Sequence, residues 1–352
     1  MSRVADQLSP RAPALAFLLA GVPLAALLDR VGFFDAVART LAGRRPGGVP
    51  VAWLWALAAV TTVVLNLDTT VVLLTPLYVR LARRSGRDPL GLAAVPLLLA
   101  AFASSVLPVS NLTNLIVVER LGPSVGDVVA HLALPSVAAA VVGWLAYRRR
   151  WPTTLTTAPD GPADRRALVV GGTVVAGLLV GFVLGPRFGV DPWMCALAAD
   201  LVLVAVTGWV PWRDVPVGTA ALVAAIAGLV ALVVPSDGIG AAVQGAGPVG
   251  LVAVSVAGAG AADAVNNLPA LLVVVDGVDR MSWGVWAWLL GVNVGAVLVP
   301  LGALANLLWW RIVRDEGVSI DLRSYLRTTV PVALPALAAA IAVLVVERLV
   351  AG

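Results

Sequence analysis

The sequence predicts an all-α polytopic membrane protein made of two inverted-topology repeats, each with a re-entrant hairpin and a broken transmembrane helix. Three observations predict this fold class: an apolar composition, a proline–asparagine motif that occurs twice, and two long apolar segments with oppositely charged flanks. Of the 352 residues, 60% are hydrophobic and 12% are charged, and the mean hydropathy is +0.96. Such values are typical of integral membrane proteins rather than of soluble domains.

The repeated motif is LPVSNLTNL at residues 107–115 and VPLGALANL at residues 299–307. Their alignment places Pro108 on Pro300 and Asn114 on Asn306, which is a constant offset of 192 residues. Proline breaks a helix, and the backbone groups that it frees are tolerated at bilayer depth only inside protein or beside a polar cavity. Either motif alone would indicate a kink in a packed helix. The matched pair instead favours the binding site of a secondary transporter, where broken helices occupy corresponding positions in two halves.

The flanks of the two long apolar segments predict that they are hairpins entering from opposite faces. Residues 51–79 are interrupted only by NLDTT at 66–70, and arginines stand on both sides of the segment. Because arginine gathers on the cytoplasmic side, both ends should lie inside, with NLDTT at the tip. Residues 247–275 have mainly acidic flanks, so both ends should lie outside, with ADAVNNLP at 262–269 as the tip.

The first repeat is assigned to residues 1–150. It begins with a spanning helix at 12–28 and a segment at 31–43 that is either an amphipathic interfacial helix or a polar loop. The hairpin at 51–79 follows, then the broken helix at 90–118 and a returning helix at 129–147. Residues 151–166, rich in Thr, Pro and Asp, are expected to form a cytoplasmic linker.

The second repeat is assigned to residues 167–352. Three helices are expected first, at about 167–186, 193–210 and 216–234. The outside hairpin at 247–275, the broken helix at 283–313 and a last helix at 330–346 complete the chain. This topology leaves only 6 of the 24 arginines outside, namely Arg3, Arg11, Arg120, Arg187, Arg280 and Arg348. The asymmetry supports the orientation and predicts a multi-pass protein of the inner or plasma membrane.

Composition also excludes several kinds of site. Cys195 is the single cysteine and His131 the single histidine, so intrachain disulfides, multi-thiolate metal sites and histidine metal centres are excluded. No ATP-binding motif occurs, and no nucleophile with a paired base indicates a membrane-embedded enzyme. We therefore expect no cofactor and no enzyme activity. A passive scaffold would not need matched breaks and tips.

Carboxyl groups in apolar segments are the candidates for binding a coupling ion, H⁺ or Na⁺. A charged side chain at the bilayer centre costs about 2.5–3.5 kcal/mol on insertion scales, so such residues are rare without a role. Asp68 at the first tip and Asp263 at the second are assigned this role. Asp200, in a spanning helix without a partner motif, is equally compatible with ion binding and with packing.

Amides, hydroxyls and one break glycine are the candidates for substrate binding, although Asn and Ser also join helices in membranes. The alternative, packing role is less favoured because the residues cluster at two tips and two breaks. They are Asn66, Thr69, Ser110, Asn111, Thr113, Asn114, Asn266, Asn267, Gly302 and Asn306.

Together, NLDTTVVLLTP at 66–76 and LPVSNLTNLIV at 107–117 resemble the ion transporter superfamily. The stretch 289–335, with its Gly-rich helix, Pro-x-Gly-x-Leu-Ala break and Leu-Trp run, looks like the arsenite permease (arsenical pump membrane protein) branch. The second tip, VNNLPALL at 265–272, resembles the same branch. The divalent-anion:sodium symporters are more distantly similar.

The resemblance implies two inverted repeats, a site at the membrane midplane and coupling to an ion gradient. It leads us to expect efflux of arsenite or antimonite coupled to proton influx. The alternative is a cation-coupled transporter of a carboxylate or another small anion. Expected partners are a small inorganic solute or anion, the lipid bilayer, a second copy in a homodimer and an ATPase subunit in trans. The net charge of +4 does not indicate nucleic acid.

Overall fold

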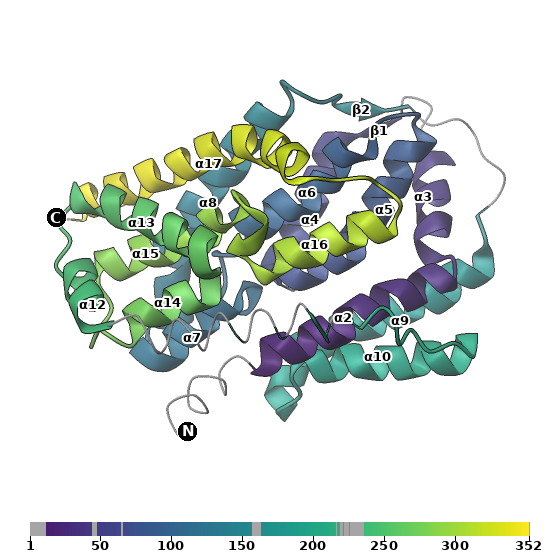
Figure 1. Cartoon of the computed structure of the whole chain (residues 1–352), viewed down its shortest axis with the longest axis horizontal. Coiled ribbons are helices and arrows are strands. Elements are labelled where there is room, and N and C mark those ends of the chain that lie inside the picture. The colour runs from purple at the N-terminus through teal and green to yellow at the C-terminus, as the bar shows by residue number, and fades with distance from the viewer. Residues whose placement is uncertain are drawn as a thin grey trace.

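The described part of the chain is mostly helical, as Figure 1 shows. The structure, a computed structural model, describes residues 12–43, 48–64, 66–156, 163–215, 217–218, 221, 225 and 236–351. Within them the only strands are β1 (Val49–Pro50) and β2 (Thr154–Leu155), which pair antiparallel. This ribbon ties the start of the first predicted hairpin to the predicted linker.

The segment at 51–79 folds as two helices with a sharp reversal between them. These are α4 (Val51–Val64) and α5 (Leu67–Arg84), and they follow α2 (Ala12–Arg30) and α3 (Phe33–Gly43). The Tyr78 hydroxyl donates to the Leu54 carbonyl at 2.6 Å, and the Thr62 hydroxyl donates to the Thr70 hydroxyl at 3.0 Å. Both pairs are centred on Asn66, so α4 and α5 are antiparallel and Asn66 lies at the tip.

The first predicted break is present. The segment divides into α6 (Pro89–Phe102), a 3₁₀ turn at Pro108–Ser110, and α7 (Leu112–Leu121). The following helix, α8 (Val125–Tyr147), begins at a capping box in which Ser124 and Asp127 bond each other's backbone N–H.

The second half begins with α9 (Arg165–Leu184), a 3₁₀ turn at Gly185–Phe188 and α10 (Pro192–Thr207). The predicted helix at 216–234 falls largely outside the described residues. The helix α12 (Ser236–Gln244) follows, which the sequence did not predict.

The rest of the second half repeats the order of the first. Two helices meet at Asn266, a broken helix follows, and one long helix ends the chain. The elements are α13 (Gly250–Val265), α14 (Asn267–Val275), α15 (Trp283–Val294), 3₁₀ turns at Gly295–Val297 and Pro300–Gly302, α16 (Leu304–Asp315) and α17 (Leu322–Val350). The predicted last helix, 330–346, was too short, because α17 begins eight residues earlier and ends four later.

The two halves pack across each other. The second arm of the first hairpin, α5, contacts α16 of the second half, and the corresponding arm α14 contacts α7 of the first. The long helices α8 and α17 lie side by side along one edge of the molecule, while α2, α9 and α10 form a group along the opposite edge (Figure 1). The second arm of each hairpin therefore contacts the broken helix of the other half.

Three helices of the described chain are long and apolar enough to cross a membrane: Val125–Tyr147, Arg165–Phe182 and Leu322–Val350. The helices of the tips and breaks are shorter, at 9 to 18 residues. A bilayer requires about 20 residues of helix, so these short pieces come from segments that are interrupted part-way.

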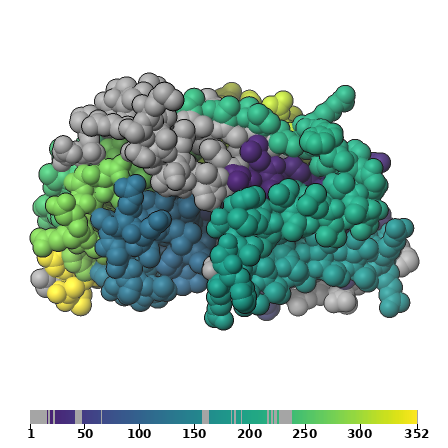
Figure 2. Space-filling model, turned by 90° about the horizontal axis from the view of Figure 1, so that it is seen from below, coloured from purple at the N-terminus to yellow at the C-terminus, as the bar shows by residue number. Residues whose placement is uncertain are grey.

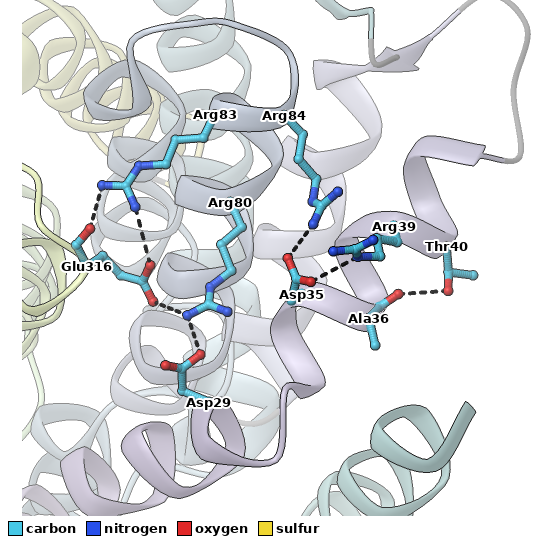
Figure 3. Close-up of polar contacts among 9 residues, drawn as sticks. All are labelled: Asp29, Asp35, Ala36, Arg39, Thr40, Arg80, Arg83, Arg84 and Glu316. Atoms are coloured by element: carbon cyan, nitrogen blue, oxygen red, sulfur yellow. Dashed lines mark hydrogen bonds and ion pairs between the residues drawn. The ribbon is translucent and has the colours of Figure 1, made fainter. Parts of the chain in front are cut away.

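Charged side chains gather where α2, α5 and α16 end and where α3 begins. Arg80 pairs with Asp29 and with Glu316 (3.0 Å to the latter), while Asp35 pairs with Arg84 and with Arg39 (2.9 Å to the latter), as Figure 3 shows. Burial raises the pKa of Glu316 despite its arginine neighbours. This cluster joins elements from both halves at one end of the molecule.

Candidate functional site

The two breaks have the same backbone geometry. Leu107 (φ −126°, ψ 153°) and Val299 (φ −128°, ψ 158°) are extended, and each leads into a three-residue 3₁₀ turn that starts with proline. After the turn the chain is extended again, at Asn111 (φ −151°, ψ 137°) and Ala303 (φ −144°, ψ 156°). The constant offset of 192 residues therefore extends from the sequence to the fold.

Asn114 and Asn306 stabilise these breaks in the same way. The Asn114 amide donates to the carbonyls of Ser104 (2.7 Å) and Leu107 (2.9 Å). The Asn306 amide donates to the carbonyls of Ala296 (2.7 Å) and Val299 (3.0 Å), which are the equivalent positions. A helix break leaves such carbonyls without helical donors, and these side chains supply them. The amide N–H groups of both asparagines are thus used inside the protein.

A closed polar network surrounds the first break. The Asn293 carbonyl oxygen accepts from the Thr113 hydroxyl (2.6 Å) and from the Asn111 amide (3.1 Å). The Asn293 amide donates to the Asn114 carbonyl oxygen (2.8 Å) and to the Ser105 hydroxyl (3.0 Å). All five side chains are buried, so each is satisfied by the others.

Asn293 belongs to α15 of the second half, so this network joins the halves. Sequence reasoning missed Asn293, Ser104 and Ser105. The only signal for Asn293 is an amide within an otherwise apolar run, GVNVG at 291–295.

At the first tip, polar groups are buried without partners. Asn66 caps α5 by accepting from the Thr69 backbone N–H at 2.7 Å. The buried Asp68 Oδ1 and Thr69 hydroxyl have no hydrogen-bond partner among the described residues. Ser110 of the first break donates to the Val63 carbonyl at 2.7 Å, which holds the tip against the break. The Asp68 oxygen and the Thr69 hydroxyl are therefore free to bind a solute or an ion.

The second tip is also hydrogen-bonded to its break, but here one of the donors lies on the tip. Asn266 has φ 78°, caps α14 and donates to the Leu301 carbonyl at 3.0 Å. Asp263 Oδ1 accepts from the Val299 backbone N–H at 3.3 Å. A Cβ on Gly302 would lie 2.8 Å from that oxygen, so the glycine permits the approach. Asn267, the first residue of α14, is buried.

The structure thus groups the predicted residues into two sets. Asn66, Asp68, Thr69 and Ser110 lie at the first tip and break, with Asn111, Thr113 and Asn114 in the adjoining network. Asp263, Asn266, Gly302 and Asn306 lie at the second tip and break. The four stretches 62–70, 104–114, 262–270 and 293–306 contain no Arg, Lys or His, and Asp68 and Asp263 are their only ionisable residues. The polar side chains of these stretches are therefore amides, hydroxyls and carboxyls only.

Comparison with known proteins identifies a family. The citrate transporter family (CitMHS) matches residues 10–292. An arsenical pump membrane protein of Yersinia enterocolitica is 27% identical, covering 94% of this chain and 85% of that protein. The arsenical pump membrane protein of Escherichia coli K12 is 26% identical with the same coverage, and an uncharacterized transporter of Mycobacterium tuberculosis is 27% identical over 91% of this chain and 84% of its own length.

Among solved structures, the YdaH transporter of Alcanivorax borkumensis aligns over 97% of this chain and 86% of that one. The TM-score is 0.45 and the sequence identity 16%.

Proposed function

Because this chain belongs to the citrate transporter family, and is thus a transporter rather than an enzyme, we propose that it exports arsenite or antimonite in exchange for protons. The substrate would be the neutral trihydroxide of the metalloid. Similarity to proteins named arsenical pump membrane proteins, extending over 94% of the chain, supports this choice.

The observation that carries the proposal is the absence of cationic side chains from the sequence of both tips and both breaks. A trihydroxide presents O–H donors and oxygen acceptors, which amides, hydroxyls and carboxyls can match. Carboxylate substrates are usually held by charge-assisted donors such as arginine. The unpartnered Asp68 oxygen and Thr69 hydroxyl are the groups best placed to take up a hydroxylated solute.

We assign the coupling step to Asp68 and Asp263. A proton carrier must bind its proton on one side of the membrane and release it on the other. A carboxyl at a hairpin tip can do so if its hydration changes as access alternates. The contact of Asp263 with the Val299 N–H supports this role, because it connects the carboxyl to the break that would move.

The proposed architecture is a pair of inverted repeats whose hairpins re-enter the inner membrane from opposite faces. The matched breaks and the reciprocal packing of α5 on α16 and of α14 on α7 support it. The arginine cluster of Figure 3 would then face the cytoplasm, while Arg120 and Asp276, paired at 2.9 Å, would face outward.

A second candidate is a cation-coupled carrier of a carboxylate, which the description of the family as citrate transporters favours. In that case a bound cation at Asp68 or Asp263 would have to offset the charge of the substrate.

The test uses proteoliposomes with an acidic lumen and a neutral exterior. We expect arsenite to accumulate in the lumen, a protonophore to abolish the accumulation, and citrate not to enter. Expression should also raise arsenite resistance in a strain that lacks its own efflux system. Uptake of citrate driven by a sodium or proton gradient, without arsenite movement, would replace the proposal with the second candidate.

A further inference from the structure

A cavity of about 380 Å³ lies between α2 and α10, in a part of the molecule that the transport proposal does not use. Figure 2 views the molecule from this side, with purple atoms of the N-terminal helix beside the teal atoms of the region that contains α9 and α10. The volume is in the range of small-molecule pockets, which run from about 300 to 1,000 Å³. The walls are nearly all aliphatic or aromatic.

Asp200 is the one ionisable side chain among the described residues that line this cavity. The residue is 7% exposed, and its buried Oδ1 has no hydrogen-bond partner in the described chain. A carboxylate in such apolar surroundings requires a proton or a cation. Protonation of Asp200 would not require a cavity, whereas a larger cation would, and Asp200 lines a cavity.

A residue whose carbonyl lacks its helical donor also belongs to the lining of this cavity. Pro23 lies within α2 and has no N–H, so the carbonyl of Leu19, four residues earlier, lacks its helical donor. Both Leu19 and Pro23 line the cavity. Two indole side chains, Trp193 and Trp212, complete the wall, and aromatic faces attract cations.

The cavity opens at apolar surface residues. Leu197 is 43% exposed, Leu201 63% and Trp212 78%, all of which line it. In a membrane such a mouth faces acyl chains, and an amphiphile could enter from the bilayer with its charged end leading. The carboxyl, the freed carbonyl and the indoles then meet the charge, and the aliphatic wall meets the chain.

We infer that the α2–α10 cavity binds a lipophilic primary ammonium ion, with the cationic group on Asp200 and the hydrocarbon part among the apolar wall residues. An ammonium group has three N–H donors, enough for both Asp200 and the Leu19 carbonyl. The inference does not depend on arsenite or citrate being the transported solute.

The test compares two brominated probes that differ only in charge, 8-bromooctylamine and 8-bromooctanol, on the full chain in lipid nanodiscs at pH 7. Bromine quenches tryptophan fluorescence on contact, and two of the 12 tryptophans line the cavity. Partition into lipid gives both probes a common non-saturable quenching. We expect the amine to add a saturable phase with at least about tenfold higher affinity than the alcohol, typical of one charge-assisted contact.

Variants then identify the groups. Asp200→Asn should abolish the amine phase and leave the alcohol curve unchanged, while Asp200→Glu should keep it. The double variant Trp193→Phe, Trp212→Phe should lose the saturable quenching by the amine. Equal curves for amine and alcohol in the wild type would mean an apolar groove that takes any chain, including lipid. An amine preference that survives Asp200→Asn would also overturn the inference.

A competition experiment needs no variant. Octylamine should displace the bromoamine from the wild-type protein, and octanol at the same membrane concentration should not. Displacement by both would show that charge is not recognised, even if Asp200→Asn failed to fold.

Discussion

At the scale of single residues, Asn293 joins the two halves through four hydrogen bonds in the buried interior. Removing one partner of a buried pair leaves the other unsatisfied, at a cost of about 1–3 kcal/mol. We expect Asn293→Ala to lower the unfolding temperature measured in detergent. In a double-mutant cycle with Thr113→Val, which removes the 2.6 Å bond, a coupling energy of about 0.5–3 kcal/mol is expected. For the control pair, Asn293→Ala and Asn306→Ala, the changes in the free energy of unfolding should be additive. A coupling energy in this pair, without one between Asn293 and Thr113, would contradict the network.

The contrast between Asn293 and Asn306 shows what the sequence could predict about the site. Asn306 was predictable because its counterpart Asn114 lies 192 residues earlier in a matching motif. At the same offset Asn293 has Ala101 as its counterpart, so no repeat pattern marks it. Its partners lie in and beside the first break, for example Thr113, which is 180 residues away in sequence. Such contacts are set by tertiary packing alone.

Asp68 and Asp263 differ from the asparagines in that they can exchange a proton. Substitution by Asn keeps the shape and an oxygen acceptor but fixes the neutral state, so the Val299 N–H keeps its partner at position 263. We predict that Asp68→Asn or Asp263→Asn retains arsenite binding and loses acceleration by a pH gradient in proteoliposomes. If both folded variants still drive uphill transport with unchanged pH dependence, neither carboxyl carries the proton.

Asp35 makes stability at low pH depend on one ion-paired group (Figure 3). Burial alone would raise the pKa of Asp35, but its bonds to Arg84 and Arg39 outweigh burial and hold the pKa below the ordinary value of 3.8. The group therefore stabilises the fold fully above pH 3.8, and this contribution is lost as the pH falls through the folded-state pKa. Unfolding temperatures measured from pH 5 downward should fall less steeply for Asp35→Asn than for the wild type. Parallel curves would show that the pairing contributes nothing.

At the scale of elements, α13 and α15 pack so closely that glycine is required between them. A Cβ on Gly291 would lie 2.1 Å from the Ser255 carbonyl oxygen, whereas a Cβ on Gly260 of α13 would meet nothing within 4 Å. Gly291→Ala should therefore destabilise the protein by about 1–3 kcal/mol. Gly260→Ala, the matched control, should be neutral or stabilising by up to about 1 kcal/mol, because alanine favours helix. The measurement is the unfolding temperature of the two variants in detergent. Equal changes in that temperature would refute close packing at Gly291.

The boundaries of α17 show why some element ends escape prediction from sequence. The sequence predicts a last helix that begins at residue 330, after Arg323 and Arg327, yet the helix begins at Leu322 and contains Pro331. Pro331 leaves the Arg327 carbonyl without its helical donor, and Arg150 donates to that oxygen at 3.5 Å. The compensating group is 177 residues away in the chain. By contrast, the breaks and tips were predicted because proline, amides and flanking charge are local signals.

At the scale of the whole molecule, ion pairs join the two halves in two places. Arg120 of α7 pairs with Asp276 after α14, and Arg80 of α5 pairs with Glu316 after α16. A rearrangement that separates the halves at either place would have to break the ion pair there. We predict that Arg120→Asp changes the transport rate several-fold and that adding Asp276→Arg restores it.

Stability separates this effect from misfolding. Exposed ion pairs contribute about 0–1 kcal/mol, so the unfolding temperature of Arg120→Asp should change little. A loss of transport that the double exchange does not repair would argue against a role for the pair in opening.

The pairing of α8 with α17 has a consequence for biosynthesis. Their contact is extensive, yet α8 ends at Tyr147 and its partner begins only at Leu322, so α17 is synthesised well after α8. At roughly 5–20 residues per second, about 175 residues of further translation would take roughly 9–35 s. During that interval the face of α8 that later meets α17 must be covered by lipid or by a membrane chaperone. Nascent chains arrested before α17 should therefore be the form that quality-control proteases recognise.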